Sequence, residues 1–350
     1  MGGEGSEQYV FVQEATGLRR RLTKSERTSF VSEGRVFRYD QFTSQSGVES
    51  TQLPVTINGQ DFIPSKGGWK TNQEGAKRLQ RASRLYGLGS TLTYVRFIDD
   101  FAAFPINNFW DDTRISGFGD PKAYVVQTAS KVIERCLLMT TDPGDLVLDP
   151  TCGSGTTAFV AEKWGRRWIT CDTSRVAVTL AKQRLMTASY DYYELKYPHE
   201  GLRGGFIYKT VPHVTLKSIA NNPEIDEIHE RMHPAIERAL EALNAVLKTA
   251  GAPFKVSEGG RKGTTLDFSS PSFPRRRESS DSDPVTGTKA LDSGSPLRGV
   301  RNDELLEWEV PFDFPDDWKP EAREAFDAFH AARQAMQKKM DDSIAAHADQ

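Results

Sequence analysis

The stretch DLVLDPTCGSGTTAFVAEKWGRRWITCD, residues 145–172, decides the fold of this 350-residue chain. Its apolar run Leu146–Leu148 leads through an Asp-Pro pair into a glycine-rich turn and a predicted helix. Residues 168–171 then indicate a second strand, which is closed by Asp172. A strand, a glycine turn, a helix and a second strand in this order predict parallel strands and a nucleotide-type cofactor site.

Helices are predicted on both sides of this stretch. Residues 128–141 place apolar side chains on one helical side, and the sequence Asp142-Pro143-Gly144 ends that helix. After Asp172, Thr173 or Ser174 caps a helix whose apolar residues recur every three to four positions as far as Ala188. The sequence therefore predicts an α/β fold with a parallel sheet.

The rest of the chain gives weaker signals. Short strands and loops are expected up to about residue 60, followed by a basic amphipathic helix over 75–86 and a strand over 91–98. An apolar stripe over 225–247 predicts a helix that Pro234 bends or restarts. Residues 251–303 are rich in Ser, Pro, Gly and charge, which predicts a disordered insert, and a further helix is expected from Pro320 on.

Composition excludes several classes of protein. No run approaches the roughly 18 apolar residues of a membrane span, and the N-terminus MGGEGSEQYV lacks the features of a secretory signal, so we expect a cytoplasmic protein. Cys136, Cys152 and Cys171 have neither CxxC spacing nor paired histidines. We therefore expect buried, inert thiols and no zinc site.

Positive charge is concentrated in one segment, although the chain as a whole has a formal net charge of −3. Residues 66–96 hold seven basic side chains against one acidic one; they are Lys66, Lys70, Lys77, Arg78, Arg81, Arg84 and Arg96. Such a segment neutralises nucleic-acid phosphates or forms a solvated helix face. Both interpretations remain open from composition alone.

The glycine turn itself fits two cofactors. Residues 153–158 satisfy G-x-G-x-x-G/A, with Asp172 placed to bind a ribose, so a nicotinamide dehydrogenase is one interpretation. However, Asp149 and the next three residues separate the strand from Gly153, and a carboxylate there would repel a pyrophosphate. It suits S-adenosylmethionine, which is cationic and lacks phosphates. A tight turn without any ligand is the third possibility.

At this point the residues resemble a known family. DPTCGSGTT, residues 149–157, is similar to the cofactor motif of amino-methylating DNA methyltransferases, and the block 122–150 resembles the segment that precedes it. The chain also resembles the adenine-specific, type III restriction-like modification enzymes over roughly 60–222, in GWKTN (68–72), YVRFIDDF (94–101), NNFWDDT (107–113) and RLMTASYDYYEL (184–195).

The resemblance implies S-adenosylmethionine as the methyl donor, adenine in double-stranded DNA as the acceptor, and a Rossmann-like methyltransferase sheet. The expected cofactor-binding residues are Asp149, Pro150, Cys152, Gly153, Ser154, Gly155, Thr156, Thr157 and Asp172, completed by Lys122, Tyr124 and Gln127. The expected DNA-binding residues are Lys66, Lys70, Lys77, Arg78, Arg81 and Arg84. The expected organisation is a partial target-recognition region (1–115), a donor-binding core (116–222), a helical segment (223–250), the insert (251–303) and a helical tail (304–350).

One departure from the family is decisive for activity. Members carry an Asp/Asn/Ser-Pro-Pro-aromatic motif that presents the flipped base, whereas no Pro-Pro pair exists in this chain. No catalytic residue is therefore predicted, and Cys152 is not read as a nucleophile. We expect the C-terminal portion of a split or longer methyltransferase, with an open sheet that exposes apolar surface. The alternative is a noncatalytic remnant or module that binds S-adenosylmethionine or DNA. The expected partners are double-stranded DNA and an upstream methyltransferase half or a restriction subunit.

Overall fold

The computed structural model describes residues 6–29, 34–103, 106–113, 127–268 and 304–349. They form a mixed α/β protein whose chain divides into two units. Unit 1 combines Met1–Phe104 with Val211–Gln350, and unit 2 comprises Pro105–Thr210. No described helix is long and apolar enough to cross a membrane.

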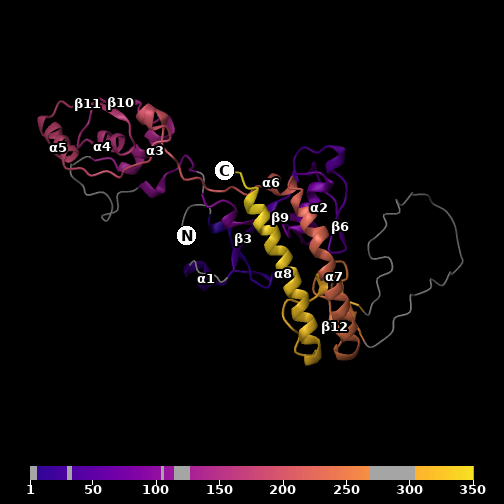
Figure 1. Ribbon diagram of the computed structural model, residues 1–350. Helices are drawn as coiled ribbons and strands as arrows, with labels where there is room; N and C mark the ends of the chain where they lie inside the picture. Colours follow the sequence, from indigo (N-terminus) through magenta and orange to yellow (C-terminus); the bar gives the residue numbers. More distant parts are fainter. Residues whose placement is uncertain (1–5, 30–33, 104–105, 114–126, 269–303, 350) are drawn as a thin grey trace. The chain divides into compact units, whose positions relative to one another are not determined.

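Unit 1 is built on a five-stranded antiparallel sheet in the order β2-β1-β3-β9-β8 (Figure 1). Its strands are β1 (Phe11–Gln13), β2 (Arg19–Arg21), β3 (Arg35–Gln41), β8 (Leu85–Leu88) and β9 (Thr91–Phe97). Small pairs accompany it: β4 (Thr43–Ser44) with β7 (Gly68–Trp69), and β5 (Val55–Ile57) with β6 (Gln60–Phe62). The short helices are α1 (Lys24–Ser29), α2 (Gln73–Arg81) and α6 (Leu216–Ala220).

Alternation along the central strands separates two faces of this sheet. Phe37 of β3 and Val95 and Phe97 of β9 form a small apolar cluster on one face. On the other face, Tyr94 and Leu92 join the main core of unit 1. This second face also carries Arg38 and Asp40 of β3 and Arg96 of β9, because residues paired across strands point the same way.

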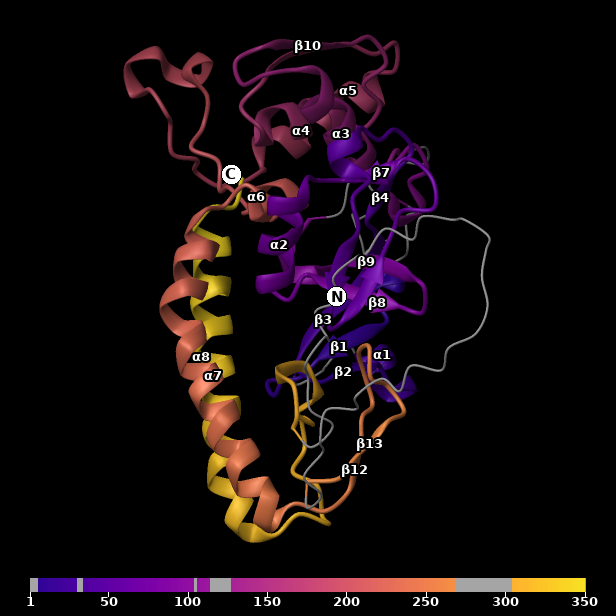
Figure 2. The same cartoon turned by 90° about the vertical axis from the view of Figure 1, so that its right-hand side faces the viewer.

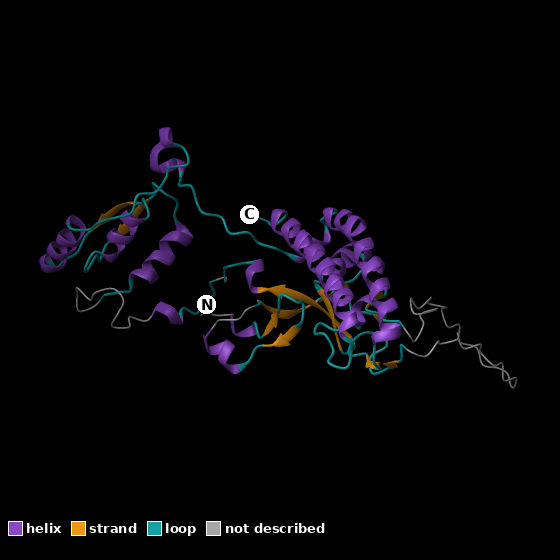
Figure 3. Ribbon diagram, turned by 60° about the horizontal axis from the view of Figure 1, so that its bottom comes forward, coloured by secondary structure: helices purple, strands orange, loops and turns teal. Residues whose placement is uncertain are grey.

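Two long helices complete the core of unit 1. They are α7 (Glu224–Ala250) and α8 (Arg323–Ala346), which lie side by side in Figures 1 and 2, with the strands of the sheet beside them in Figure 3. The start of α7 meets the end of α8, where Asn222 donates to Ser343 Oγ at 2.9 Å, so the pair is antiparallel. The predicted C-terminal helix is confirmed, with Phe326, Phe329, Met336, Met340 and Ile344 all buried.

Two expectations for the C-terminal half are wrong. Of the two alternatives predicted at Pro234, a bend or a restart, the restart is wrong, because helix α7 continues through the proline with its apolar side buried before and after it, at Ile228 and Ile236. Disorder was expected from residue 251 on, yet β12 (Phe254–Lys255) pairs with β13 (Thr265–Leu266). Leu266 and Phe268 bury apolar area in the main core, which stabilises residues 254–268 despite their polar composition. The remainder of the predicted insert, 269–303, lies outside the described residues.

Unit 2 contains a parallel pair of strands with helices on one side. The strands are β10 (Leu146–Asp149) and β11 (Arg167–Thr170), and the helices are α3 (Ser130–Thr140), α4 (Thr156–Lys163) and α5 (Arg175–Met186). These elements confirm the strand-helix-strand-helix order predicted from residues 145–188. Val147 and Trp168 face α3 and α4, where Leu137, Val160 and Ala161 form a small core.

The opposite face of β10 and β11 is open. Leu148 pairs with Ile169 on this face, and these side chains are 67% and 54% exposed. Leu146, one pleat earlier on the same face, is 53% exposed. The expected exposure of apolar surface by a half-covered parallel sheet is thus confirmed.

Candidate cofactor site

The predicted cofactor residues gather where the two parallel strands of unit 2 end. Asp149 is the last residue of β10, and the parallel register places it opposite Thr170, the last residue of β11. The ladder extends past both strands, because Cys171 N–H donates to Asp149 O at 3.1 Å and Cys152 N–H donates to Cys171 O at 2.9 Å. The glycine turn and the segment after β11 are therefore held side by side.

Asp172 fastens these two segments together. Its Oδ2 accepts from Gly153 N–H at 2.9 Å, and its Oδ1 accepts from Ser174 N–H at 2.8 Å. These two N–H groups hold the pKa of the Asp172 carboxyl below its usual value because they stabilise the charged form. Each carboxylate oxygen keeps a further lone pair, so Asp172 remains able to accept hydrogen bonds from a ligand.

Helix α4 begins at a glycine that no other residue replaces without strain. Gly155 is its N-cap, with φ of +75°, and its N–H donates to Cys152 O at 2.7 Å. A Cβ at this position would lie 2.8 Å from Ala181 Cβ, so the absence of a side chain lets α5 approach the turn. Gly153 also has a positive φ, of +50°. The turn thus presents backbone where a side chain would otherwise stand.

Several of the predicted residues point inward. Cys152, Ser154 and Thr156 are buried, and the hydroxyls of Ser154 and Thr156 lie 3.2 Å apart. Arg184 of α5 donates to Thr156 Oγ1 at 3.0 Å and packs over the ring of Phe159. These side chains shape the turn from beneath rather than line its surface.

Arg184 was missed by sequence reasoning. The signal is its spacing from Ala177 and Ala181, which are buried on the side of α5 that faces the turn. From the sequence alone, Arg184 marks only the polar edge of an amphipathic helix, because its contact with the Thr156 hydroxyl is not visible there.

The remaining predicted cofactor residues are placed as follows. Asp149 is half-buried and its Oδ1 accepts from Thr151 N–H at 3.0 Å; Pro150 is exposed, and Thr157 and Gln127 are half-buried. Lys122 and Tyr124 lie outside the described residues. The structure therefore groups Asp149 and Asp172 at the turn.

The charge at this edge fits a cationic ligand that carries a diol. Asp149 and Asp172 stand at the ends of adjacent strands, and within the described part of the chain no Lys or Arg forms an ion pair with either. Two carboxylates without a counter-ion disfavour a pyrophosphate and favour an ammonium, a sulfonium or ribose hydroxyls. S-adenosylmethionine fits these requirements.

Two of the three cysteines differ from expectation. Cys152 is buried, as predicted, whereas Cys136 and Cys171 are exposed. Cys136 lies on α3, of which only Leu137 is buried, and Cys171 continues β11 on the open face of the sheet. The prediction of buried thiols is therefore wrong at these two positions.

The six predicted DNA-binding residues separate into three groups. Arg84 is 1% exposed and forms a bidentate pair with Asp100, at 2.6 and 2.9 Å, so its assignment to the DNA surface is wrong. Arg78 and Arg81 of α2 both pair with Asp226, at 2.7 and 2.6 Å. Lys66, Lys70 and Lys77 are exposed. Only the lysines carry charge that no carboxylate in the described residues neutralises.

With this geometry established, the chain was compared with known proteins. Residues 60–183 match the DNA methylase model of N6 and N4 methyltransferases. This segment belongs to the DNA methylase family. The match spans strands β6 to β9 of unit 1 and the glycine turn of unit 2, which contains the motif quoted above.

Curated relatives of the methylase segment are modification enzymes. The type II methyltransferase M2.DpnII of Streptococcus pneumoniae is 42% identical over 59 residues, which are 17% of this chain and 22% of the relative. The "Probable type III restriction-modification enzyme HindVI Mod subunit" of Haemophilus influenzae is 37% identical over 84 residues, 23% and 11% of the two chains. The DNA adenine methyltransferase YhdJ of Escherichia coli is 33% identical over 84 residues, 24% and 29% of the two chains.

These alignments cover less than a third of each relative. The similarity therefore establishes the kind of domain, and the activity of a whole enzyme does not follow from it.

Proposed function

We propose that unit 2 binds S-adenosylmethionine in a Rossmann-like half-sheet and that the chain serves the methylation of the exocyclic amine of adenine in double-stranded DNA. The observation that carries this proposal is the pair of un-neutralised carboxylates, Asp149 and Asp172, at the ends of adjacent parallel strands. The DNA methylase family supports it independently.

Each residue of the turn has a distinct role in this proposal. Asp172 accepts hydrogen bonds from the ribose hydroxyls, and Asp149 attracts the positively charged methionine end of the donor. Gly153 and Gly155 let the backbone approach the adenosine, and Arg184 fixes the hydroxyls below the turn. Pro150 and Thr157 complete the turn, and Lys122, Tyr124 and Gln127 adjoin the donor by resemblance to the family.

When bound, the donor supplies a methyl group on an electrophilic sulfonium, so no protein nucleophile is needed. The protein contributes binding, orientation and charge. Presentation of the target amine requires a motif that the sequence lacks, because it contains no Pro-Pro pair. We therefore propose that these 350 residues by themselves bind the donor without transferring the methyl group.

Substitution of Asp172 tests the donor site. Asp172→Ala should weaken S-adenosylmethionine binding at least tenfold in isothermal titration, because a charged acceptor of hydrogen bonds is lost. Asp191→Ala removes an exposed carboxylate of the same unit and serves as the matched control, with unchanged affinity expected.

The pH dependence sharpens this test. Because the pKa of Asp172 lies below its usual value, the carboxylate stays charged and donor affinity should hold as the pH falls from 7 to about 5. Affinity should fall only when the pH drops below the ordinary range of an aspartate carboxyl and through the lowered pKa of Asp172. Unchanged binding by Asp172→Ala, or tighter binding of a nicotinamide dinucleotide than of S-adenosylmethionine, would reject the proposed donor site.

A further inference from the structure

A pocket of about 510 Å³ lies within unit 1, away from the donor-binding turn in the sequence. Its lining combines strands β3, β7 and β9, the segment after β4, and the start of α6. All of these elements belong to unit 1, so the pocket does not depend on how the two units are arranged. Its volume is in the range of small-molecule sites and is large enough for a nucleotide.

Basic side chains surround this pocket. Lys70, Arg96 and Lys217 line it, against a single carboxylate, that of Asp40. Asp40 is already shared between two guanidinium groups, those of Arg38 at 3.1 Å and Arg96 at 3.4 Å. The lining therefore has a net positive charge, which favours an anion.

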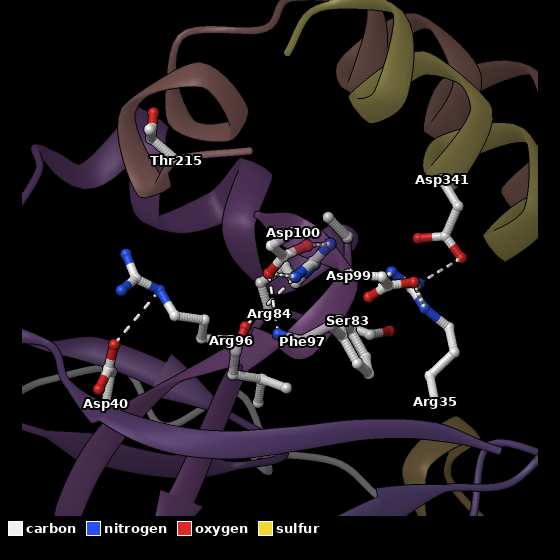
Figure 4. A network of polar contacts seen from close by, with 12 residues as sticks. Arg35, Asp40, Ser83, Arg84, Arg96, Phe97, Asp99, Asp100, Thr215 and Asp341 are labelled. Atoms are coloured by element: carbon white, nitrogen blue, oxygen red, sulfur yellow. Dashed lines mark hydrogen bonds and ion pairs between the residues drawn. The ribbon is translucent and has the colours of Figure 1, made fainter. Parts of the chain in front are cut away.

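The sheet register explains why these groups meet. Asp40 of β3 is directly opposite Tyr94 of β9, and Arg38 is opposite Arg96, so all four side chains leave the same face. Figure 4 shows Arg96 and Asp40 facing each other, with Thr215 at the N-terminal end of α6 near them. Lys217 follows on α6, is exposed, and has no ion pair among the described residues.

One buried polar group at the pocket has no partner in the protein. Tyr94 lines the pocket and is 2% exposed, yet its hydroxyl makes no hydrogen bond within the described structure. Burial raises the pKa of Tyr94 to about 12, so the hydroxyl keeps its proton and remains a donor. An unsatisfied buried hydroxyl is destabilising, and a ligand with an acceptor oxygen removes that cost.

The remaining wall of the pocket is held in place by close packing. Residues 44–51 contribute hydroxyls, including Ser46 and Thr51, and close backbone packing fixes this segment. A Cβ at Gly47 would lie 2.5 Å from the backbone of Gly67 and Gly68, so the segment rests directly on the β7 strand. Trp69, stacked on Phe42 at 5.3 Å, adds an apolar wall.

We propose that this pocket binds a phosphate-bearing nucleotide, with the phosphate held by Lys70, Arg96 and Lys217 and the sugar or base against Trp69. This inference rests on the proposed function, which makes DNA the expected source of the nucleotide. The nucleic-acid contact of unit 1 then lies at the pocket and not on the basic face of α2 that was expected from the sequence. The same chemistry would also accept a free mononucleotide.

The test compares two kinds of variant of the full-length chain. Lys70→Ala with Lys217→Ala removes two charges at the pocket, and Lys338→Ala with Lys339→Ala removes two exposed charges on α8 as the matched control. Tyr94→Phe removes only the unpartnered hydroxyl, and should leave the melting temperature unchanged or slightly higher. Fluorescence anisotropy with a labelled single-stranded 20-mer, and calorimetric titration with deoxyadenosine monophosphate, measure binding.

The pocket lysine variant should lose at least tenfold in affinity for the 20-mer, and its salt slope should fall by about 1.4. Tyr94→Phe should lose about tenfold, whereas the α8 control should bind like wild type. If only mononucleotide binding depends on the pocket, the source is a free nucleotide. If neither ligand is affected by these variants, or wild type binds neither, the pocket proposal is overturned.

Donor binding separates this proposal from the one before it. If wild type binds S-adenosylmethionine normally and DNA affinity does not change in the pocket variants, only the pocket proposal is refuted. If DNA affinity falls in the pocket variants but wild type does not bind S-adenosylmethionine, only the proposed donor site is refuted.

Discussion

At the scale of single residues, the basic side chains of segment 66–96 have different structural roles. Arg84 holds the core together, Arg78 and Arg81 pair with Asp226, and Lys70 and Arg96 line a pocket. Composition identifies the excess of positive charge but not the carboxylates that neutralise it. One of those carboxylates, Asp226, is 148 residues from Arg78, so only the fold reveals which charges remain free.

Arg84 provides the first prediction. Arg84→Met should lower the free energy of unfolding by about 3–5 kcal/mol, because it leaves the Asp100 carboxylate buried without its partner. Arg84→Met combined with Asp100→Asn should recover a large part of that loss, since no buried charge is left. Chemical denaturation of wild type, Arg84→Met, Asp100→Asn and the double variant measures the coupling.

A DNA-binding measurement on the same variant tests whether Arg84 contacts DNA. Folded Arg84→Met should bind the oligonucleotide as wild type does. A variant that kept its stability but lost DNA affinity would contradict the buried role of Arg84.

The donor turn was more predictable than the pocket at this scale. Asp149, Gly155 and Asp172 follow strands and precede helices within 30 residues of one another, so local patterns suffice to place them. Asp40 and Tyr94 lie on strands about 50 residues apart, Lys217 lies more than 100 residues further along the chain, and nothing in their local sequence marks them. Pairing across β3 and β9 alone brings the first two together.

At the scale of elements, close approach of α5 to the donor turn explains why α4 begins with glycine. Gly155→Ala should destabilise unit 2 by about 2–4 kcal/mol, from the positive φ and from the 2.8 Å approach to Ala181. Gly263→Ala is the control, in unit 1, since Gly263 has φ of +86° in the turn closed by Thr264 N–H and Arg261 O but no atom within 4 Å of an added Cβ.

The control should cost only about 1–2 kcal/mol, the penalty of the backbone conformation. Urea unfolding gives both values, and titration with S-adenosylmethionine should show weaker binding for Gly155→Ala alone. Equal costs at the two positions would mean that α5 does not pack on the turn.

Element prediction succeeded where periodicity is long and failed where tertiary contacts decide. Helices α3, α5 and α8 follow directly from apolar spacing. The β12–β13 pair does not, because its stability comes from burying Leu266 and Phe268, the latter edge-on to Trp318 at 6.0 Å. A segment rich in Gly and charge carries no local sign of such distant packing.

At the scale of the whole molecule, the chain leaves unit 1 and returns to it. Residues 105–210 form unit 2 between two parts of unit 1 that share one hydrophobic core. Sequence-based boundaries assume contiguous segments, so this arrangement was beyond them, and the assignment of 1–115 to target recognition stays a prediction. The donor turn and the nucleotide pocket belong to different units, and each site can therefore be tested by variants of its own unit.

The open face of unit 2 supports the last prediction. Leu148→Thr and Ile169→Thr should each change the free energy of unfolding by no more than about 0.5 kcal/mol, because both side chains are already more than half exposed. Val160→Thr, at a position 1% exposed on the covered side, should cost about 1–3 kcal/mol by burying a hydroxyl. The surface substitutions should also reduce self-association in sedimentation velocity, since they shrink an apolar patch. If Leu148→Thr instead cost as much as Val160→Thr, this face would be covered in solution, and the sheet of unit 2 would already have the partner that a parallel sheet requires on both faces.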